Sequence, residues 1–156
     1  MDIPALLDLY RKRGWMIATA ESCTGGLIAA TLTEIAGSSD VVDRGFVTYS
    51  NEAKTDLIGV PVELIREHGA VSAEVAAAMA DGALARSRAS VTVAVTGIAG
   101  PGGGSAEKPV GLVYIGLRKS DQEKPLVERH VFEGRRYEVR LQSVVRAIDL
   151  LFEAAR

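Results

Sequence analysis

The chain has 156 residues, the size of one ordinary domain, and we expect a single domain over residues 1–156. Hydrophobic residues make up 47% of the chain and charged residues 24%, values typical of a globular protein with its own core. The 18 basic and 20 acidic side chains nearly balance and only 5% of residues are aromatic, which argues against a nucleic-acid-binding protein. A single cysteine excludes an internal disulfide and a cysteine-rich zinc site, and two histidines argue against a histidine-built metal site.

Nothing in the sequence predicts export or membrane insertion. The first residues, MDIPALLDLYRKRGW, start acidic and contain no long apolar run, unlike a signal peptide. No stretch reaches the ~18 consecutive apolar residues that a membrane-spanning helix requires. We therefore expect a cytoplasmic enzyme or binding domain that does not act at a membrane.

The hydrophobic pattern predicts strands that alternate with helices. Helices are expected over residues 3–13, 25–36, 51–59, 72–88 and 135–155, with a further helical turn opened by Pro61. Strands are expected over residues 15–20, 44–50, 91–96, 110–117 and, at a sheet edge, 125–132. Because the two kinds of element interleave, the expected architecture is a layered α/β/α domain.

The first candidate site is the turn of residues 20–26, AESCTGG, between a strand and a helix. Ligands of open α/β sheets bind beyond the carboxyl ends of the strands, and free N–H groups at a helix start favour an anion. Ser22 and Thr24 would add hydroxyl donors. The alternative is that one of them only caps the helix. Cys23 is a possible nucleophile, although a lone cysteine is more often a small core residue.

The second candidate combines the turn Gly37-Ser38-Ser39 with residues 48–54, TYSNEAK. Tyr49 is expected to end a strand, and Lys54 to lie in the first turn of the next helix. The positive end of that helix and desolvation would both lower the pKa of Lys54. A partly neutral lysine can accept a serine proton, as in Ser–Lys variants of the Ser–His–Asp triad. The alternative is a solvated lysine beside a surface tyrosine, and sequence distance does not show whether Ser39 meets Lys54.

The third candidate is the glycine-rich loop of residues 96–105, TGIAGPGGGS. It lacks the Gly-Lys-Ser/Thr ending of a P-loop, and a strand rather than a helix follows it, unlike a dinucleotide fingerprint. So many glycines indicate left-handed turns, a mobile lid or backbone close to a ligand, the alternative being a plain connection. Arg135, Arg136 and Arg140 open the last helix, where arginine either clamps a phosphate or forms a solvated basic face.

Five motifs occur in the order AESCTGG, AGSS, GFVTYSNEAK, GAVS and TGIAGPGGGSAEKPVG, and they closely resemble the CinA C-terminal domain family. The resemblance extends over about residues 3–153. Single-domain members of this family are nicotinamide mononucleotide deamidases, whereas the larger CinA proteins carry an extra N-terminal domain. Because the chain starts at its own Met1 and has no room for that domain, we expect the single-domain form.

The resemblance implies a three-layer α/β/α sandwich with a mixed, mostly parallel sheet. It also implies hydrolysis of the carboxamide of nicotinamide mononucleotide to nicotinic acid mononucleotide and ammonia, in pyridine nucleotide recycling. Carried onto this chain, Ser39 would be the nucleophile, Lys54 the general base and Tyr49 an aid to proton transfer. Combined with the three candidate segments, it gives an expected substrate-binding set of Ser22, Thr24, Gly25, Gly26, Thr96, Gly97, Gly100 and Arg136. Arg135 and Arg140 are alternatives to Arg136, whose stretch is less distinctive.

The expected mechanism is attack by the Ser39 hydroxyl on the carboxamide carbon, with backbone N–H groups near Ser38 and Ser39 holding the oxyanion. No metal or cofactor is required, and the expected partners are the small-molecule substrate and a second copy of the chain in a homodimer. Two alternatives stay open. One is an amidase that uses Cys23 with Glu21 and a lysine, and the other is a non-catalytic nucleotide-binding or regulatory domain linked to competence or DNA damage.

Overall fold

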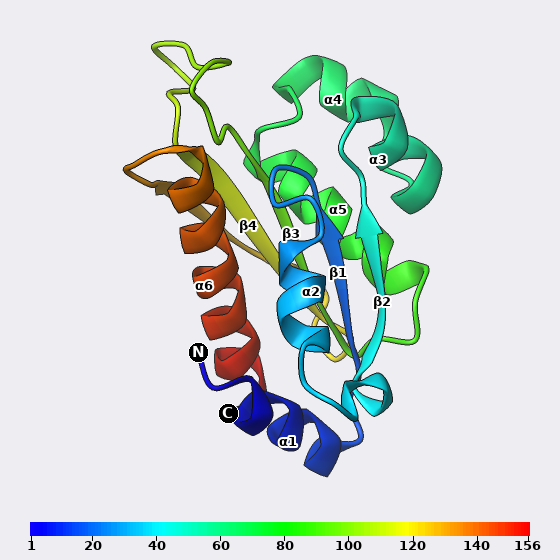
Figure 1. Cartoon of the computed structure of the whole chain (residues 1–156). Helices are drawn as coiled ribbons and strands as arrows, with labels where there is room; N and C mark the ends of the chain where they lie inside the picture. Colours follow the sequence, from blue (N-terminus) through cyan, green and yellow to red (C-terminus); the bar gives the residue numbers. More distant parts are fainter.

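A five-stranded sheet runs through the middle of the molecule (Figure 1). The structure, a computed structural model, describes residues 1–156. In chain order the strands are β1 (Ile17–Glu21), β2 (Val42–Val47), β3 (Val91–Gly97), β4 (Leu112–Lys119) and β5 (Leu126–Val131). Their order across the sheet is β2-β1-β3-β4-β5.

The sheet is mixed, as expected. Strand β1 pairs in parallel with β2 and β3, whereas β4 is antiparallel to both β3 and β5. Parallel and antiparallel pairings are thus equal in number, where a mostly parallel sheet was expected. The reason is that the glycine-rich loop returns the chain from β3 directly into β4, without the crossover helix that a parallel neighbour needs.

Helices cover both faces of the sheet, which confirms the three-layer α/β/α architecture (Figure 1). One layer holds α1 (Ile3–Arg13), α2 (Leu27–Thr33) and α6 (Arg136–Ala155). The other holds α3 (Asn51–Ile58), α4 (Val62–His68) and α5 (Ala73–Ala85). The turn expected at Pro61 is thus the complete short helix α4. None of the helices combines the length and the hydropathy needed to cross a membrane.

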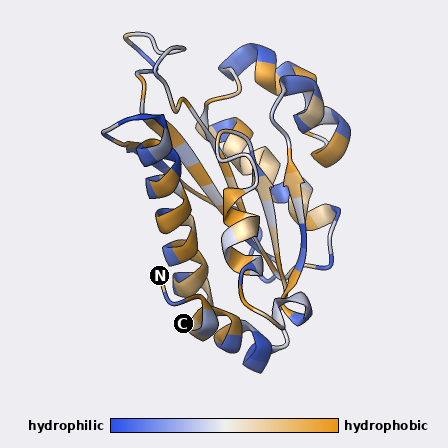
Figure 2. Ribbon diagram, in the orientation of Figure 1, coloured by the Kyte–Doolittle hydropathy of each residue, from blue (hydrophilic) through white to orange (hydrophobic).

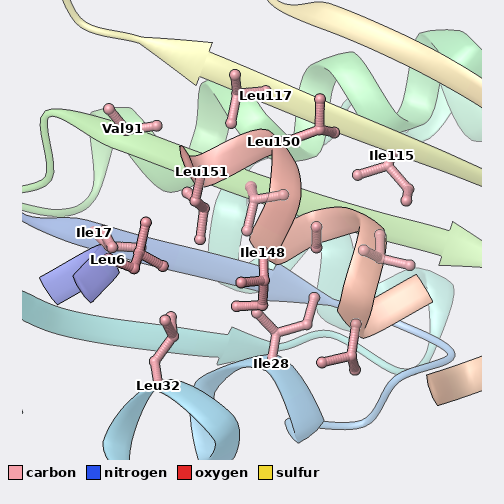
Figure 3. Close-up of a cluster of buried hydrophobic side chains, with 14 of the residues drawn as sticks. Leu6, Ile17, Ile28, Leu32, Val91, Ile115, Leu117, Ile148, Leu150 and Leu151 are labelled. Atoms are coloured by element: carbon pink, nitrogen blue, oxygen red, sulfur yellow. The ribbon is translucent and has the colours of Figure 1, made fainter. Parts of the chain in front are cut away.

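Apolar side chains fill the space between each helical layer and the sheet. The larger core lies under α1, α2 and α6 and includes Leu6, Ile17, Ile28 and Ile148, all fully buried (Figure 3). Burial of one such side chain contributes roughly 1.5–3 kcal/mol. A smaller core, built around Met79, joins α3, α4 and α5 to the opposite face. Helix α6 alternates apolar and polar residues along its length, as a helix with one buried face should (Figure 2).

The sheet topology decides where the candidate segments lie. The last residue of β1, Glu21, is in register with Val47 at the end of β2 and with Val95, two residues before the end of β3. The segments that follow these three strands therefore meet at one edge of the sheet. The segment that precedes β2, a 3-10 turn over Ser38–Asp40, lies at the opposite edge beside α1 (Figure 1).

Candidate active site

A buried lysine–serine pair lies at the carboxyl edge of the parallel strands. Lys54 is in the first half of α3, whose N-cap Ser50 accepts a hydrogen bond from Ala53 N. The Lys54 side chain turns inward, is only 1% exposed, and brings Nζ to 3.0 Å from Ser22 Oγ. Ser22 follows β1 directly. The two candidate segments that contain these residues therefore meet, although they are far apart in sequence.

The surroundings of Lys54 favour its neutral form as a base. Burial lowers the pKa of the Lys54 ammonium below its ordinary value. Nζ also lies 3.0 Å from the carbonyl oxygen of Thr48 and 3.4 Å from those of Tyr49 and Ser50. A neutral amine has two N–H donors and one lone pair. When the carbonyls accept those two N–H groups, the lone pair is left to accept the proton of the Ser22 hydroxyl.

The expected pairing of Ser39 with Lys54 is absent from the structure. Ser39 is exposed in the 3-10 turn that precedes β2, whereas Lys54 follows that strand. The neighbouring Asp40 is held by Arg11 of α1, at 2.6 Å, at the far edge of the sheet. The six residues of β2 separate the two edges by about 20 Å. The serine that meets Lys54 is Ser22, which the sequence analysis placed among the substrate-binding residues.

Tyr49 is also placed differently from its expected role. Its backbone carbonyl contacts Lys54 Nζ, but its side chain is 61% exposed and its hydroxyl accepts a hydrogen bond from Arg136 Nη2 at 2.9 Å. Arg136 Nη1 donates to the Gly100 carbonyl at 2.8 Å. Arg136 thus links the segment after β2 to the glycine-rich loop. A relay from Ser22 to Lys54 needs no tyrosine, because the two atoms already touch.

The turn of residues 22–26 is shaped by two glycines and held in place by Arg140. Gly25 and Gly26 adopt left-handed backbone angles, with φ of 60° and 104°, which side chains disfavour, so α2 begins at Leu27 rather than at the expected residue 25. The Arg140 guanidinium donates to the carbonyls of Cys23 and Thr24, at 3.0 and 3.2 Å. Among the three arginines, Arg140 therefore holds the turn and Arg136 reaches the cavity.

The N-terminus of α2 does not offer an open anion site, contrary to expectation. The carboxylate of Glu21 occupies it, accepting hydrogen bonds from Ile28 N at 2.8 Å and Ala29 N at 3.1 Å. The backbone N–H group of Cys23 has no backbone acceptor. Cys23 directly follows Ser22 in the chain, and the N–H of the residue after a nucleophilic serine is often an oxyanion donor.

Ser22 and Lys54 line a cavity of about 290 Å³. It has fifteen lining residues: Ser22, Cys23, Tyr49, Asn51, Lys54, Ala70, Val71, Thr96, Gly97, Ile98, Ala99, Gly100, Gly102, Gly103 and Arg136. Thr24, Gly25 and Gly26 are not among them, and the Thr24 side chain is fully buried. The lining contains no carboxylate, and Arg136 gives it a permanent positive charge, whereas the pKa of Lys54 is lowered. This electrostatic environment favours an anionic ligand.

Several wall residues were missed by the sequence analysis. Ala70 and Val71 come from the connection between α4 and α5, and Ala70 O accepts a hydrogen bond from Thr96 Oγ1 at 2.9 Å. The motif GAVS, residues 69–72, contains both, so the signal was present but carried no recognisable chemistry. Asn51, the first residue of α3, is a further polar wall residue.

Cys23 lines the cavity but does not have the environment of a nucleophile. Its side chain is 6% exposed and belongs to the larger core. Burial raises the pKa of the Cys23 thiol to about 11, so the thiol stays protonated near neutral pH. Glu21, the residue expected to assist it, is already bonded to the N-terminus of α2.

These features define the protein class as an α/β/α domain with a serine–lysine pair in a basic cavity at the carboxyl edge of its parallel strands. The chain belongs to the CinA C-terminal domain family, which matches residues 4–155. It is similar to a competence/damage inducible protein, CihA, from Agrobacterium tumefaciens, with 52% identity and a TM-score of 0.95 over 99% of this chain and 93% of that one. A CinA superfamily protein from Klebsiella pneumoniae gives 34% identity and a TM-score of 0.91 over 99% of this chain and 98% of that one.

Curated relatives give the same family. A CinA-like protein from Syntrophobacter fumaroxidans is 54% identical over 145 residues, which cover 93% of this chain and 34% of that protein. One from Geobacter sulfurreducens is 50% identical over 147 residues, which cover 94% and 35%. The chain thus spans about a third of the length of these relatives.

Proposed function

We propose that this chain hydrolyses the carboxamide of nicotinamide mononucleotide to nicotinic acid mononucleotide and ammonia, with Ser22 as nucleophile and Lys54 as general base. The observation that carries the proposal is the 3.0 Å contact between Lys54 Nζ and Ser22 Oγ within the cavity. The basic lining supports an anionic substrate, such as the phosphate ester of a nucleoside. The carboxamide and the nicotinamide ring follow from the family resemblance of the motifs.

The reaction proceeds through an ester of Ser22. Lys54 Nζ takes the hydroxyl proton as Ser22 Oγ bonds to the carboxamide carbon. The N–H group of Cys23, which lines the cavity, stabilises the negative charge that develops on the carbonyl oxygen. As the carbon–nitrogen bond breaks, the Lys54 ammonium returns its proton to the leaving nitrogen, which departs as ammonia.

Water completes the cycle by hydrolysing the ester. Lys54 accepts a proton from the attacking water and then gives it to Ser22 Oγ as the carbon–Oγ bond breaks. The product acid leaves in its ionised form. Arg136 lines the cavity and donates hydrogen bonds to the Tyr49 hydroxyl and the Gly100 carbonyl. From this position its charge attracts the phosphate of the substrate.

The test is ammonia release from nicotinamide mononucleotide by the purified protein, treated with chelator, and by its Ser22→Ala variant. The proposal expects release by the wild type and loss of release in the variant. Binding of the mononucleotide without ammonia release by the wild type would contradict the proposal. That result would instead support the non-catalytic nucleotide-binding domain, which needs the basic cavity but not the lysine–serine contact.

A further inference from the structure

Glu21 is a buried carboxylate that the proposed mechanism leaves without a role. The residue is 1% exposed, and its two oxygens accept hydrogen bonds from the N–H groups of Ile28 and Ala29. Thr19 Oγ1 lies 3.5 Å from Oε2. An ionised carboxylate is costly to bury unless its charge is compensated, and the N-terminus of a helix provides that compensation. Glu21 therefore caps α2 from the preceding strand, across the whole intervening turn.

The same residue is connected to both members of the lysine–serine pair. Ser22 is its direct neighbour in the chain. The Glu21 carbonyl accepts a hydrogen bond from Thr48 N at 2.9 Å, and the Thr48 carbonyl in turn contacts Lys54 Nζ at 3.0 Å. The main chain of Glu21 thus aligns the end of β1 with the segment that holds Lys54.

We infer that Glu21 is a positioning residue for Ser22, an inference that rests on the proposed function. Its carboxylate closes the turn of residues 22–26 by tying the end of β1 to the start of α2. The closed turn holds Ser22 Oγ against Lys54 and leaves the N–H group of Cys23 free for an oxyanion. The two left-handed glycines in the turn give it the freedom to open when the carboxylate tie is lost.

The test compares Glu21→Gln with Glu34→Gln, which changes an exposed carboxylate at the other end of α2. Glutamine keeps the shape of the side chain but presents an NH₂ group to one of the two N–H donors. We expect at least a tenfold lower kcat per folded molecule in Glu21→Gln, with KM changed less than threefold, and no change in Glu34→Gln. Glu21→Asp keeps the charge on a shorter side chain and should fall between the wild type and Glu21→Gln.

A role in folding alone is distinguished by the reactivity of Ser22. Labelling of Ser22 by a serine-directed fluorophosphonate, which needs no carboxamide, should slow in Glu21→Gln in parallel with kcat. Wild-type kcat per folded molecule in Glu21→Gln and Glu21→Asp would overturn the inference, because only the folded fraction would then depend on Glu21. If Glu21→Gln does not fold, Glu21→Asp supplies the same comparison.

Failure of the proposed function is recognised separately. In that case the wild type releases no ammonia, and the positioning role is decided by fluorophosphonate labelling and by amide hydrogen exchange. The amides of Ile28 and Ala29 should be protected in the wild type, although they lie in the first turn of α2, and should lose protection in Glu21→Gln. Unprotected amides in the wild type would overturn the inference.

Discussion

Replacing Ser22 by alanine is the sharpest test of the site, because Ser39→Ala provides a matched control on a second serine. The Ser22 hydroxyl is the group that Lys54 Nζ meets at 3.0 Å, whereas Ser39 is exposed at the opposite sheet edge. Loss of a nucleophile forces water to attack the amide directly. We expect kcat to fall by about 10³-fold or more in Ser22→Ala, equivalent to ~4 kcal/mol or more of transition-state stabilisation, and to stay unchanged in Ser39→Ala.

The stability of Ser22→Ala should change much less than its activity. The hydroxyl has one hydrogen-bond partner, Lys54 Nζ, and that amine keeps the nearby carbonyl oxygens as acceptors. Removal of one such hydrogen bond costs about 1 kcal/mol. For a chain of this length the melting temperature should fall by roughly 2–4 °C. The variant should thus remain folded at the assay temperature.

The assay is ammonia release under saturating nicotinamide mononucleotide, with thermal unfolding followed on the same preparations. Ser22 is not the nucleophile if Ser22→Ala keeps more than a tenth of the wild-type kcat while it is folded. An inactive but folded Ser39→Ala would instead assign the nucleophile to Ser39, the position implied by the family resemblance.

Three further measurements test the chemistry and the fold. The kcat/KM of the wild type should rise with pH and reach its plateau below the pKa of an ordinary lysine, because burial lowers the pKa of Lys54. Lys54→Met should be inactive at every pH. Activity in that variant would contradict the role of Lys54 as the base. Cys23→Ala should stay active. Iodoacetamide should react slowly with the folded wild type, because burial raises the pKa of the Cys23 thiol to about 11. Rapid inactivation by iodoacetamide that substrate prevents would favour cysteine catalysis. Glu128→Gln should lower the free energy of unfolding by about 1 kcal/mol at pH 7, measured by urea unfolding against the exposed-site control Glu107→Gln. The hydrogen bond from Arg146 to Glu128, at 2.6 Å, lowers the pKa of Glu128 from 4.5 to about 2. The loss of unfolding free energy in Glu128→Gln should therefore be complete above pH 4.5 and disappear as the pH falls toward 2. A loss that is independent of pH would argue against the ion pair.

The fold was largely predictable because its elements are strongly patterned. The expected strand over residues 91–96 is β3, and the expected edge strand over 125–132 contains β5. The expected helix over 25–36 is shorter in the structure, where α2 covers Leu27–Thr33, and its later start follows from the left-handed turn of the glycine pair before it. Periodicity locates a helix well, but its ends depend on backbone angles and on tertiary partners such as the Glu21 carboxylate.

The candidate site was predictable in its residue types but not in its pairing. The rule that ligands bind beyond the carboxyl ends of strands pointed to the turn after β1, and in the structure the segment after β2 and the loop after β3 line the same cavity as that turn. Ser39, by contrast, precedes β2, whereas Lys54 follows it. The expected strand over residues 44–50 lies between Ser39 and Lys54, and residues on either side of a strand lie at opposite edges of a sheet. The expected pairing of Ser39 with Lys54 rested on the family resemblance alone.

The arrangement of Lys54 indicates that the site carries a cost in stability. A lysine ammonium in a buried position loses its hydration, and no carboxylate forms an ion pair with it; the carbonyl oxygens and Ser22 Oγ are its nearby acceptors. Because its pKa is lowered in the folded chain, the folded protein binds fewer protons there than the unfolded chain, and its stability decreases as the pH falls through the range below 10.5. A lysine with only a structural role would gain from a nearby carboxylate or from exposure to solvent. The folded chain keeps Lys54 buried beside a serine hydroxyl instead, which is the environment that a general base for Ser22 requires.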